Sequence, residues 1–215
     1  MGIKERKERH KEDLKDRILQ AAKKLFVKEG YEATSIRKIA AEIEFSPTTI
    51  YLYYKDKTDI AYALHQEGFN LLRERLGSLV YVDQPFERLK AMGRAYIQFA
   101  VDHPDFYELM FIMKEPMQYL QAHHPEEEWP EGERVFDALM QTVAACQEAG
   151  LFGSVGTPEM AMLSWSTVHG LCSLYITSHF KHVAEKCISE TDSLDTDGLL
   201  ENIFAVYVQL LEKFS

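Results

Sequence analysis

Hydroxyl, aromatic and ammonium groups are concentrated between residues 46 and 57, in the segment SPTTIYLYYKDK. Ser46 is a good N-cap and Pro47 suits the first position of a helix, so a short helix is expected to begin here. The first residues of such a helix can reach base edges in the major groove of DNA, and hydroxyl and lysine groups bind phosphates. The segment therefore has the chemistry of a DNA contact, with candidate side chains on Pro47, Thr48, Thr49, Tyr51, Tyr53, Lys55 and Lys57.

Two further helices are predicted ahead of this segment and would position it. The first has apolar residues at helical spacing, and Gly30 can end it in a left-handed conformation. The second is capped by Thr34, also a candidate DNA contact, and exposes Arg37 opposite its apolar face. The third is expected to continue to Tyr54. The residues predicted to point inward are Leu14, Ile18, Ala22, Leu25, Phe26, Ile36, Ile39, Ala40, Ile43, Ile50 and Tyr54.

Three short helices with a tight turn between the second and third form a helix-turn-helix arrangement. Residues 18–60, ILQAAKKLFVKEGYEATSIRKIAAEIEFSPTTIYLYYKDKTDI, resemble the tetracycline-repressor (TetR) family of regulators. The ordered set of short motifs, from Ala-Ala-x-x-Leu-Phe to Tyr-x-Tyr-Tyr-Lys-x-Lys, carries the resemblance. It implies an operator-binding regulator, with DNA contacts at Arg37, Thr48, Thr49, Tyr51, Tyr53 and Lys57.

One position departs from the family pattern. Members of the family usually have glycine in the bend between the second and third helices, whereas this chain has Glu44. A non-glycine residue at positive φ costs of the order of 1 kcal/mol. The turn is therefore expected either to change its backbone conformation or to keep positive φ at Glu44 at that energetic cost.

The remainder of the chain is predicted to be helical as well, so the fold class is all-α: a three-helix DNA-binding domain at residues 1–57 and a larger helical domain at residues 58–215. No segment alternates polar and apolar residues as a half-buried strand would. The predicted helices are about Thr58–Gly77, Pro85–Val101, Pro104–Met113, Gly132–Ala149, Pro158–Lys181 and Thr196–Phe214.

The larger domain is rich in methionine and aromatic residues between Met92 and Tyr175. Such residues usually form core, but a cavity that they line would bind an apolar or aromatic effector. The segment HPDFYELMF and the motif Trp165-x-x-x-His169-Gly170 resemble the C-terminal domain of a TetR subgroup named for its Trp-His-Gly motif. His169 is either a ligand contact or a buried histidine bonded to the backbone. The candidate ligand-binding residues are Met92, Tyr96, Phe99, Phe106, Met110, Trp165, His169 and Cys172.

Charge is distributed unevenly in a chain whose net charge is −10. Residues 1–60 carry 14 basic and 11 acidic residues, whereas the remaining residues carry 10 and 23. The distribution would turn the N-terminal domain toward DNA, although acidity also simply favours solubility. The tail KERKERHKEDLKDR is interpreted as an extension of the first helix, with a basic arm in the minor groove as the alternative.

Several further expectations concern location, assembly and competing functions. No signal peptide or membrane-spanning run is present, and three cysteines suggest no disulfide framework, so a cytoplasmic protein is expected. The family pattern implies a homodimer formed through the two C-terminal helices, which would bind double-stranded DNA with an inverted-repeat operator.

No cofactor, metal or catalytic residue is predicted. The alternatives are a metal-responsive regulator using His123, His124, Glu126, Glu127 and Glu128, and an all-α enzyme, for which no motif is found. The effector, the operator and the choice between repression and activation are left open.

Overall fold

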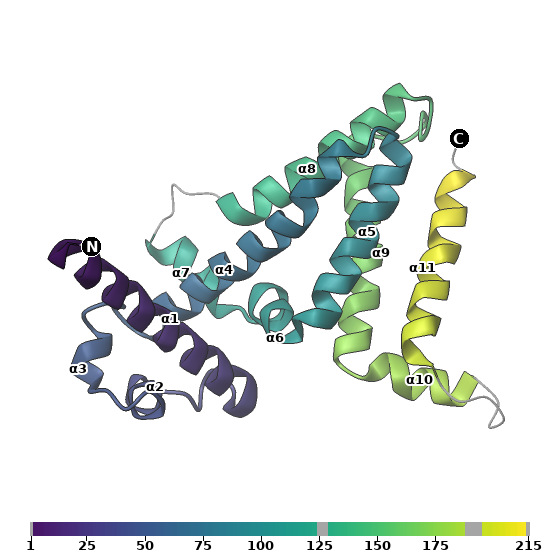
Figure 1. The fold of residues 1–215 in the computed structure, drawn as a ribbon. Helices are drawn as coiled ribbons and strands as arrows, with labels where there is room; N and C mark the ends of the chain where they lie inside the picture. The colour runs from purple at the N-terminus through teal and green to yellow at the C-terminus, as the bar shows by residue number, and fades with distance from the viewer. Residues whose placement is uncertain (1, 124–128, 188–194, 214–215) are drawn as a thin grey trace. The chain divides into compact units, whose positions relative to one another are not determined.

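The computed structural model describes residues 2–123, 129–187 and 195–213, and every regular element in this part of the chain is helical (Figure 1). The all-α prediction is therefore confirmed. The chain folds into two compact units. The first unit comprises residues 1–69 and 105–129, and the second comprises residues 70–104 and 130–215. The predicted functional division after residue 57 remains a prediction.

The helices that begin in the first unit include the three of the predicted DNA-binding domain. Helix α1 includes the charged N-terminal tail, which confirms that the tail extends the first helix. The helix α4 continues into the second unit. These helices are α1 (Ile3–Glu29), α2 (Ile36–Glu42), α3 (Pro47–Ile50), α4 (Lys57–Gly77) and α7 (Glu115–His123), with the short helix α6 (Pro104–Tyr107) and the π-helical turn η2 (Glu108–Ile112) leading into α7.

The helices of the second unit pack around one central trio. Helices α5, α8 and α9 contact one another, and α10 and α11 both contact α9 (Figure 1). The elements are the 3₁₀ turn η1 (Ser78–Tyr81), α5 (Pro85–Asp102), α8 (Pro130–Glu148), α9 (Thr157–Ile176), α10 (His179–Cys187) and α11 (Thr196–Glu212). None of the helices in the described parts of the chain is long and apolar enough to span a membrane.

The core of the first three helices consists of the residues that the sequence predicted. All eleven residues named above as inward-pointing are buried, from Leu14 in α1 to Tyr54 after α3. Gly30 ends α1 with φ +85° and ψ 157°, a conformation that glycine adopts readily because it has no Cβ. Ser46 accepts a hydrogen bond from the Thr49 N–H at 3.2 Å, and Pro47 occupies the first turn of α3, as predicted.

Three sequence predictions about helix boundaries were wrong. The N-cap of α2 is Ser35, which accepts from the Lys38 N–H, because Thr34 is buried and donates to the Gly30 carbonyl instead. Helix α3 ends at Ile50 and is followed by turns through Tyr53. The predicted helix Pro158–Lys181 is two helices, α9 and α10, because Ser178 has φ +62° and breaks the ladder.

Helix α7 was not predicted. It starts just after Lys114, with Pro116 in its first turn, and it buries the aromatic ring of Tyr119 and the side chain of Leu120. A nine-residue helix with few buried apolar residues gives a weak periodic signal, so contacts with the rest of the first unit are needed to stabilise it.

Glu44 lies in a left-handed turn that ends α2. Its φ is +60°, its N–H donates to the Ala41 carbonyl, and the Phe45 N–H donates to the Ala40 carbonyl, which together form a Schellman motif. The Arg17 guanidinium supports the turn by donating to the Ile43 carbonyl at 3.0 Å and lying 5.1 Å from the centre of the Phe45 ring. The bend therefore keeps its geometry and holds a non-glycine residue at positive φ.

Replacing Glu44 by glycine should raise the free energy of unfolding by about 0.5–1 kcal/mol. Glycine removes left-handed strain of about 1–2 kcal/mol, and its greater freedom in the unfolded chain offsets part of that gain. Chemical denaturation at one fixed protein concentration would measure the change. Glu44→Ala is the matched control, because it removes the carboxylate but keeps Cβ; equal stability of the two variants would contradict the strain at this position.

Candidate DNA-binding surface and ligand site

The exposed side chains on α2, on α3 and in the turns that follow α3 form a candidate DNA-binding surface. Arg37 projects from α2 and, among the described residues, makes neither an ion pair nor a hydrogen bond. Thr48 and Lys55 are also exposed, and Tyr51 is 56% exposed. Buried residues on the opposite faces of the same helices, including Ile39 and Ile50, fix these side chains on a rigid frame.

The remaining predicted contacts are less accessible. Pro47, Thr49 and Tyr53 are partly buried, and the Thr49 hydroxyl is within hydrogen-bonding distance of the Ser46 hydroxyl, at 2.9 Å. Thr34 is only 2% exposed and its hydroxyl is bonded to the Gly30 carbonyl at 2.9 Å, so in this structure it supports the loop before α2.

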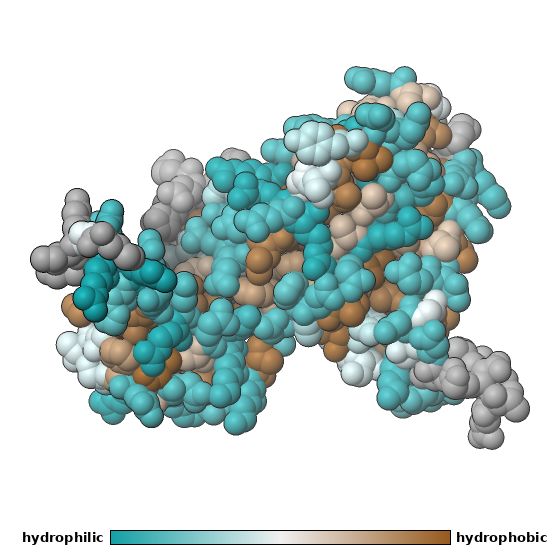
Figure 2. Space-filling view, viewed as in Figure 1, coloured by the Kyte–Doolittle hydropathy of each residue, from teal (hydrophilic) through white to brown (hydrophobic). Residues whose placement is uncertain are grey.

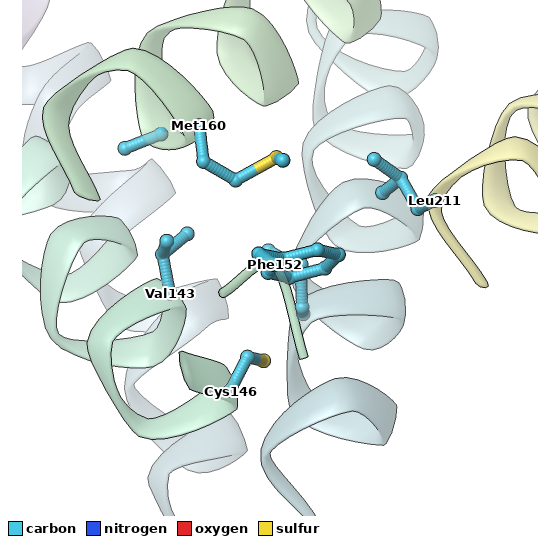
Figure 3. Close-up of a cluster of buried hydrophobic side chains, with 7 residues drawn as sticks. Val143, Cys146, Phe152, Met160 and Leu211 are labelled. Atoms are coloured by element: carbon cyan, nitrogen blue, oxygen red, sulfur yellow. The ribbon is translucent and has the colours of Figure 1, made fainter. Parts of the chain in front are cut away.

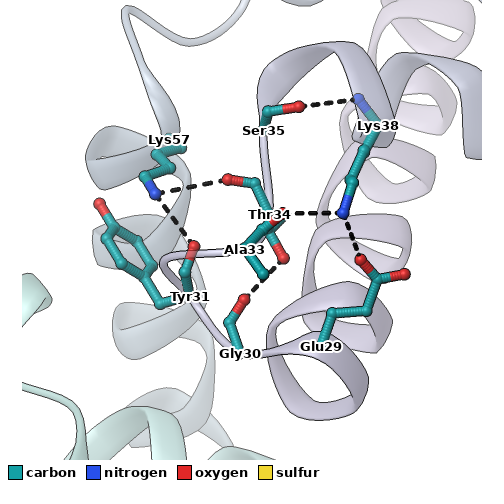
Figure 4. Close-up of polar contacts among 8 residues, drawn as sticks. All are labelled: Glu29, Gly30, Tyr31, Ala33, Thr34, Ser35, Lys38 and Lys57. Carbon is teal, nitrogen blue, oxygen red and sulfur yellow. Dashed lines mark hydrogen bonds and ion pairs between the residues drawn. The ribbon is translucent and has the colours of Figure 1, made fainter.

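Lys57 holds that loop from the start of α4. Its Nζ donates to the carbonyls of Tyr31 and Thr34 at 3.0 and 3.3 Å and lies 4.1 Å from the centre of the Tyr31 ring (Figure 4). The Tyr31 hydroxyl also bonds to Thr58 at 2.8 Å, and burial raises the pKa of Tyr31. These contacts give Lys57 a structural role, and a phosphate contact by the same ammonium group stays a prediction.

The other side of the loop is fixed by a second lysine. Lys38 donates to the Glu29 carboxylate at 2.7 Å and to the Ala33 carbonyl at 2.9 Å (Figure 4). The ion pair and hydrogen bond lower the pKa of Glu29. The loop between α1 and α2 is thus held from both sides, which fixes the start of α2 and with it the position of Arg37.

One exposed residue on this surface was missed by sequence reasoning. Leu52 follows Tyr51 and is 76% exposed, an unusual position for a large apolar side chain. A methyl-rich side chain next to the predicted base contacts suits the methyl group of thymine. The only signal in the sequence was that Leu52 falls outside the apolar spacing of Ile50 and Tyr54.

In the second unit, three of the predicted ligand-binding residues form a partly buried polar group between α5 and α9. The Tyr96 hydroxyl is 3.0 Å from Nδ1 of His169, and the Trp165 indole N–H donates to the same hydroxyl at 3.3 Å. Burial lowers the pKa of His169. His169 thus has a tyrosine side chain as one of its partners, and its role as a ligand contact stays a prediction.

The other predicted ligand-binding residues are core residues with distinct partners. Met92 accepts a hydrogen bond from the Thr142 hydroxyl, Phe99 packs against His103, and burial raises the pKa of Cys172 to about 12. Phe106 and Met110 belong to the first unit, where Lys23 lies 4.1 Å from the centre of the Phe106 ring.

The second unit also contains a cavity of about 140 Å³ lined by residues of α4, η1, α5 and α8. Of the eight predicted ligand-binding residues, only Met92 lines it. Three arginines that sequence reasoning did not single out line it as well: Arg73, Arg88 and Arg134. Their distance apart in the chain gave no local motif to detect.

Two regions of the chain match family models, and together they span most of it. Residues 18–64 match the family described as bacterial regulatory proteins, tetR family, and residues 89–194 match the tetracyclin repressor-like C-terminal domain. The chain belongs to the TetR family. The first match covers the candidate DNA-binding surface of this TetR protein, and the second covers Tyr96, Trp165 and His169. The finer likeness to the Trp-His-Gly subgroup stays a prediction.

Relatives of this TetR protein are similar along nearly its whole length. The uncharacterized HTH-type transcriptional regulator YvkB of Bacillus subtilis is 25% identical over 196 residues, which cover 90% of this chain and 94% of YvkB. The fatty acid degradation regulator FadR from Bacillus halodurans has the same fold, with a TM-score of 0.69, 19% identity and coverage of 90% and 94%. AibR, solved in complex with isovaleryl coenzyme A and operator DNA, has a TM-score of 0.60, 20% identity and coverage of 89% and 96%.

Proposed function

We propose that this TetR-family chain is a ligand-responsive transcriptional regulator that binds an inverted-repeat operator as a homodimer. The observation that carries the proposal is the exposure of Arg37 and Thr48 on two short helices whose other faces are buried, and of Tyr51 in the turn that follows α3. A helix-turn-helix reads bases through such side chains, and one such surface per chain favours binding as a symmetric pair.

The proposed dimer surface is formed by α9 and α11. Several large apolar side chains on these helices are about half exposed, and a group of such side chains can mark a protein interaction surface. Figure 2 shows hydrophobic residues interspersed with hydrophilic ones on the visible face. Gly170 faces open space on α9, so a partner helix could approach closely there. The exposed apolar residues are Met162, Leu163, Leu174, Val206 and Leu210.

We infer that the second unit binds the effector and that binding lowers operator affinity, so that the protein acts as a repressor. The partly buried group of Tyr96, Trp165 and His169 offers polar atoms among aromatic rings, which suits a mainly apolar or aromatic ligand. The AibR complex with isovaleryl coenzyme A and operator DNA supports a small-molecule effector by analogy of fold. To release DNA, the ligand must bind more tightly to the conformation that binds DNA less well.

Two alternatives are less favoured. A metal-responsive regulator would need a cluster of ligands, and no group of three or more His, Cys, Asp or Glu is suitably placed in the parts of the chain that are described. The predicted loop ligands at 124–128, and the side chain of His123, lie outside the described residues. An enzyme is not favoured because the family is one of transcriptional regulators.

Arg37→Ala and Tyr51→Ala should each weaken binding to the selected operator by about 1–3 kcal/mol, the range for loss of a base contact. The operator would first be recovered by selection from a random DNA library, and affinity then measured by fluorescence anisotropy. Tyr81→Ala is the matched control, because Tyr81 is 85% exposed and lies outside the DNA-binding surface. Wild-type affinity in both test variants would refute this surface.

A further inference from the structure

We propose that the cavity in the second unit binds a short-chain amphiphilic anion, with its apolar chain inside and its carboxylate or phosphate at the arginines. The cavity lies where the end of α4, η1, the start of α5 and the middle of α8 meet, all within the second unit. The proposal goes beyond the proposed function, because it names a ligand site apart from Tyr96, Trp165 and His169 and an anionic class of ligand for it. The argument rests on charge, on the apolar lining and on volume.

The charge of the cavity is opposite to that of its surroundings. After residue 60 the chain has 23 acidic residues and only 10 basic ones, five of which are arginines. Three of those five, Arg73, Arg88 and Arg134, line the cavity, and its lining includes no acidic residue. A basic cavity in an acidic domain attracts anions selectively, because repulsion disfavours their binding elsewhere on the domain.

The three guanidinium groups are also available to a ligand. Arg88 donates through Nε to the Val82 carbonyl at 3.0 Å, and Arg73 donates to the Asn70 side chain at 3.2 Å. Neither these two nor Arg134 pairs with a carboxylate among the described residues, whereas nearby Arg75 pairs with Asp102 at 2.8 Å. Guanidinium groups without a carboxylate partner can bind a carboxylate or phosphate through paired hydrogen bonds.

The rest of the lining is mainly apolar, and the volume of the cavity accommodates a short chain. An engineered cavity of about 150 Å³ holds benzene, so about 140 Å³ accommodates a ring or a chain of about six carbons. The Thr142 hydroxyl bonds to Met92 and to the Ala138 carbonyl, so its hydrogen is already used within the protein. The apolar residues of the lining are Leu76, Leu79, Val80, Met92, Val135 and Ala138.

The place of the cavity in the chain offers a route to regulation, which rests on the proposed function. Arg73 and Leu76 lie near the end of α4, the same helix that begins with Lys57 and its hydrogen bonds to the loop before α2. Met92 is one helical turn from Tyr96 on α5. A ligand in the cavity would therefore contact both α4, which begins in the first unit, and α5, which carries Tyr96.

The test is calorimetric titration of the full chain with hexyl phosphate, hexanoate, hexanol and inorganic phosphate. At least one of the two amphiphilic anions should bind saturably, at least about 10-fold more tightly than hexanol or inorganic phosphate; the tighter of the two identifies the head group. Arg134 is exposed, and Arg134→Gln should lower the affinity for that anion about 10-fold. Arg94→Gln is the matched control, because Arg94 is exposed on α5 outside the cavity.

Ala138→Leu provides an independent check. Leucine fills the cavity without changing its charge, so this variant should no longer bind the alkyl chain of the anion. The site would be overturned if hexanol bound as tightly as the anions, or if Arg134→Gln and Arg94→Gln lost the same affinity for the anion. It would also be overturned if Ala138→Leu bound the anion as tightly as wild type. DNA affinity is measured separately with and without the tighter anion. Binding without a change in DNA affinity would uphold the site and refute the effector role, whereas failure of the Arg37 and Tyr51 variants to weaken DNA binding would refute the DNA-binding proposal alone.

Discussion

Replacing Phe152 by alanine should lower the free energy of unfolding by about 3–5 kcal/mol. The Phe152 ring is fully buried in the cluster that joins α8, α9 and α11, where Val143, Cys146, Met160 and Leu211 surround it (Figure 3). Close packing lets the surrounding helices relax only in part, so most of the volume of the ring would be left as a cavity. Denaturant unfolding followed by circular dichroism would measure the loss, at one protein concentration because the proposed dimer links stability to concentration.

A second variant at the same position separates packing from backbone strain. Phe152 has φ +59°, so alanine keeps the left-handed strain whereas glycine relieves it. Phe152→Gly should therefore be no less stable than Phe152→Ala, although it removes one more carbon. A loss of less than 1 kcal/mol in Phe152→Ala would show that this ring does not hold the core together.

Lowering the pH from 6.5 to 4 should cost the first unit about 3 kcal/mol of stability through His65 alone. His65 is fully buried, and neither ring nitrogen has a hydrogen-bond partner among the described residues. Burial lowers the pKa of His65 to about 4 in the folded chain, from an ordinary value of 6.5. The rings of Tyr62, Phe69 and Trp129 surround it with centre-to-centre distances of 4.9–6.3 Å.

The sign follows from which state takes up the proton. Above pH 6.5 the imidazole is neutral in both states, and its full contribution is present. Between pH 6.5 and pH 4 only the unfolded chain gains a proton at His65, so stability falls by about 1.4 kcal/mol per pH unit until the folded pKa is reached. Partly buried His169 also has a pKa lowered by burial and acts in the same direction, so the wild-type curve contains both contributions.

His65→Leu isolates the contribution of His65, because leucine has a similar volume and does not titrate. The variant should be at least as stable as wild type at pH 7, since it removes buried nitrogens that lack partners, and it should lose about 3 kcal/mol less on acidification. Unfolding would be measured in denaturant at pH 7, 5.5 and 4. His182→Leu, at an exposed histidine, is the control. Parallel pH curves for wild type and His65→Leu would show that His65 is accessible to protons in the folded state.

Local chemistry in the sequence determined the first unit's three-helix core and the exposure of its candidate DNA-binding surface. The spacing of Leu14, Ile18 and Ile39 identified their buried faces, and Ser46 with Pro47 marked the start of α3. Such signals are reliable because a helix repeats every 3.6 residues and because capping bonds join residues two or three positions apart. Arg37 and Tyr51 could therefore be assigned to an exposed face before the structure was known.

Tertiary structure alone decided two features that are built from residues distant in the chain: the loop before α2 and the cavity of the second unit. The loop before α2 needs the buried hydroxyl of Thr34, which leaves Ser35 as the cap, and it takes up the Lys57 ammonium from 23 to 26 residues away. The three arginines of the cavity come from α4, α5 and α8, so no short sequence motif identifies them as neighbours. Burial and long-range charge depend on how separate helices pack, and helical periodicity records only which face of each helix is buried.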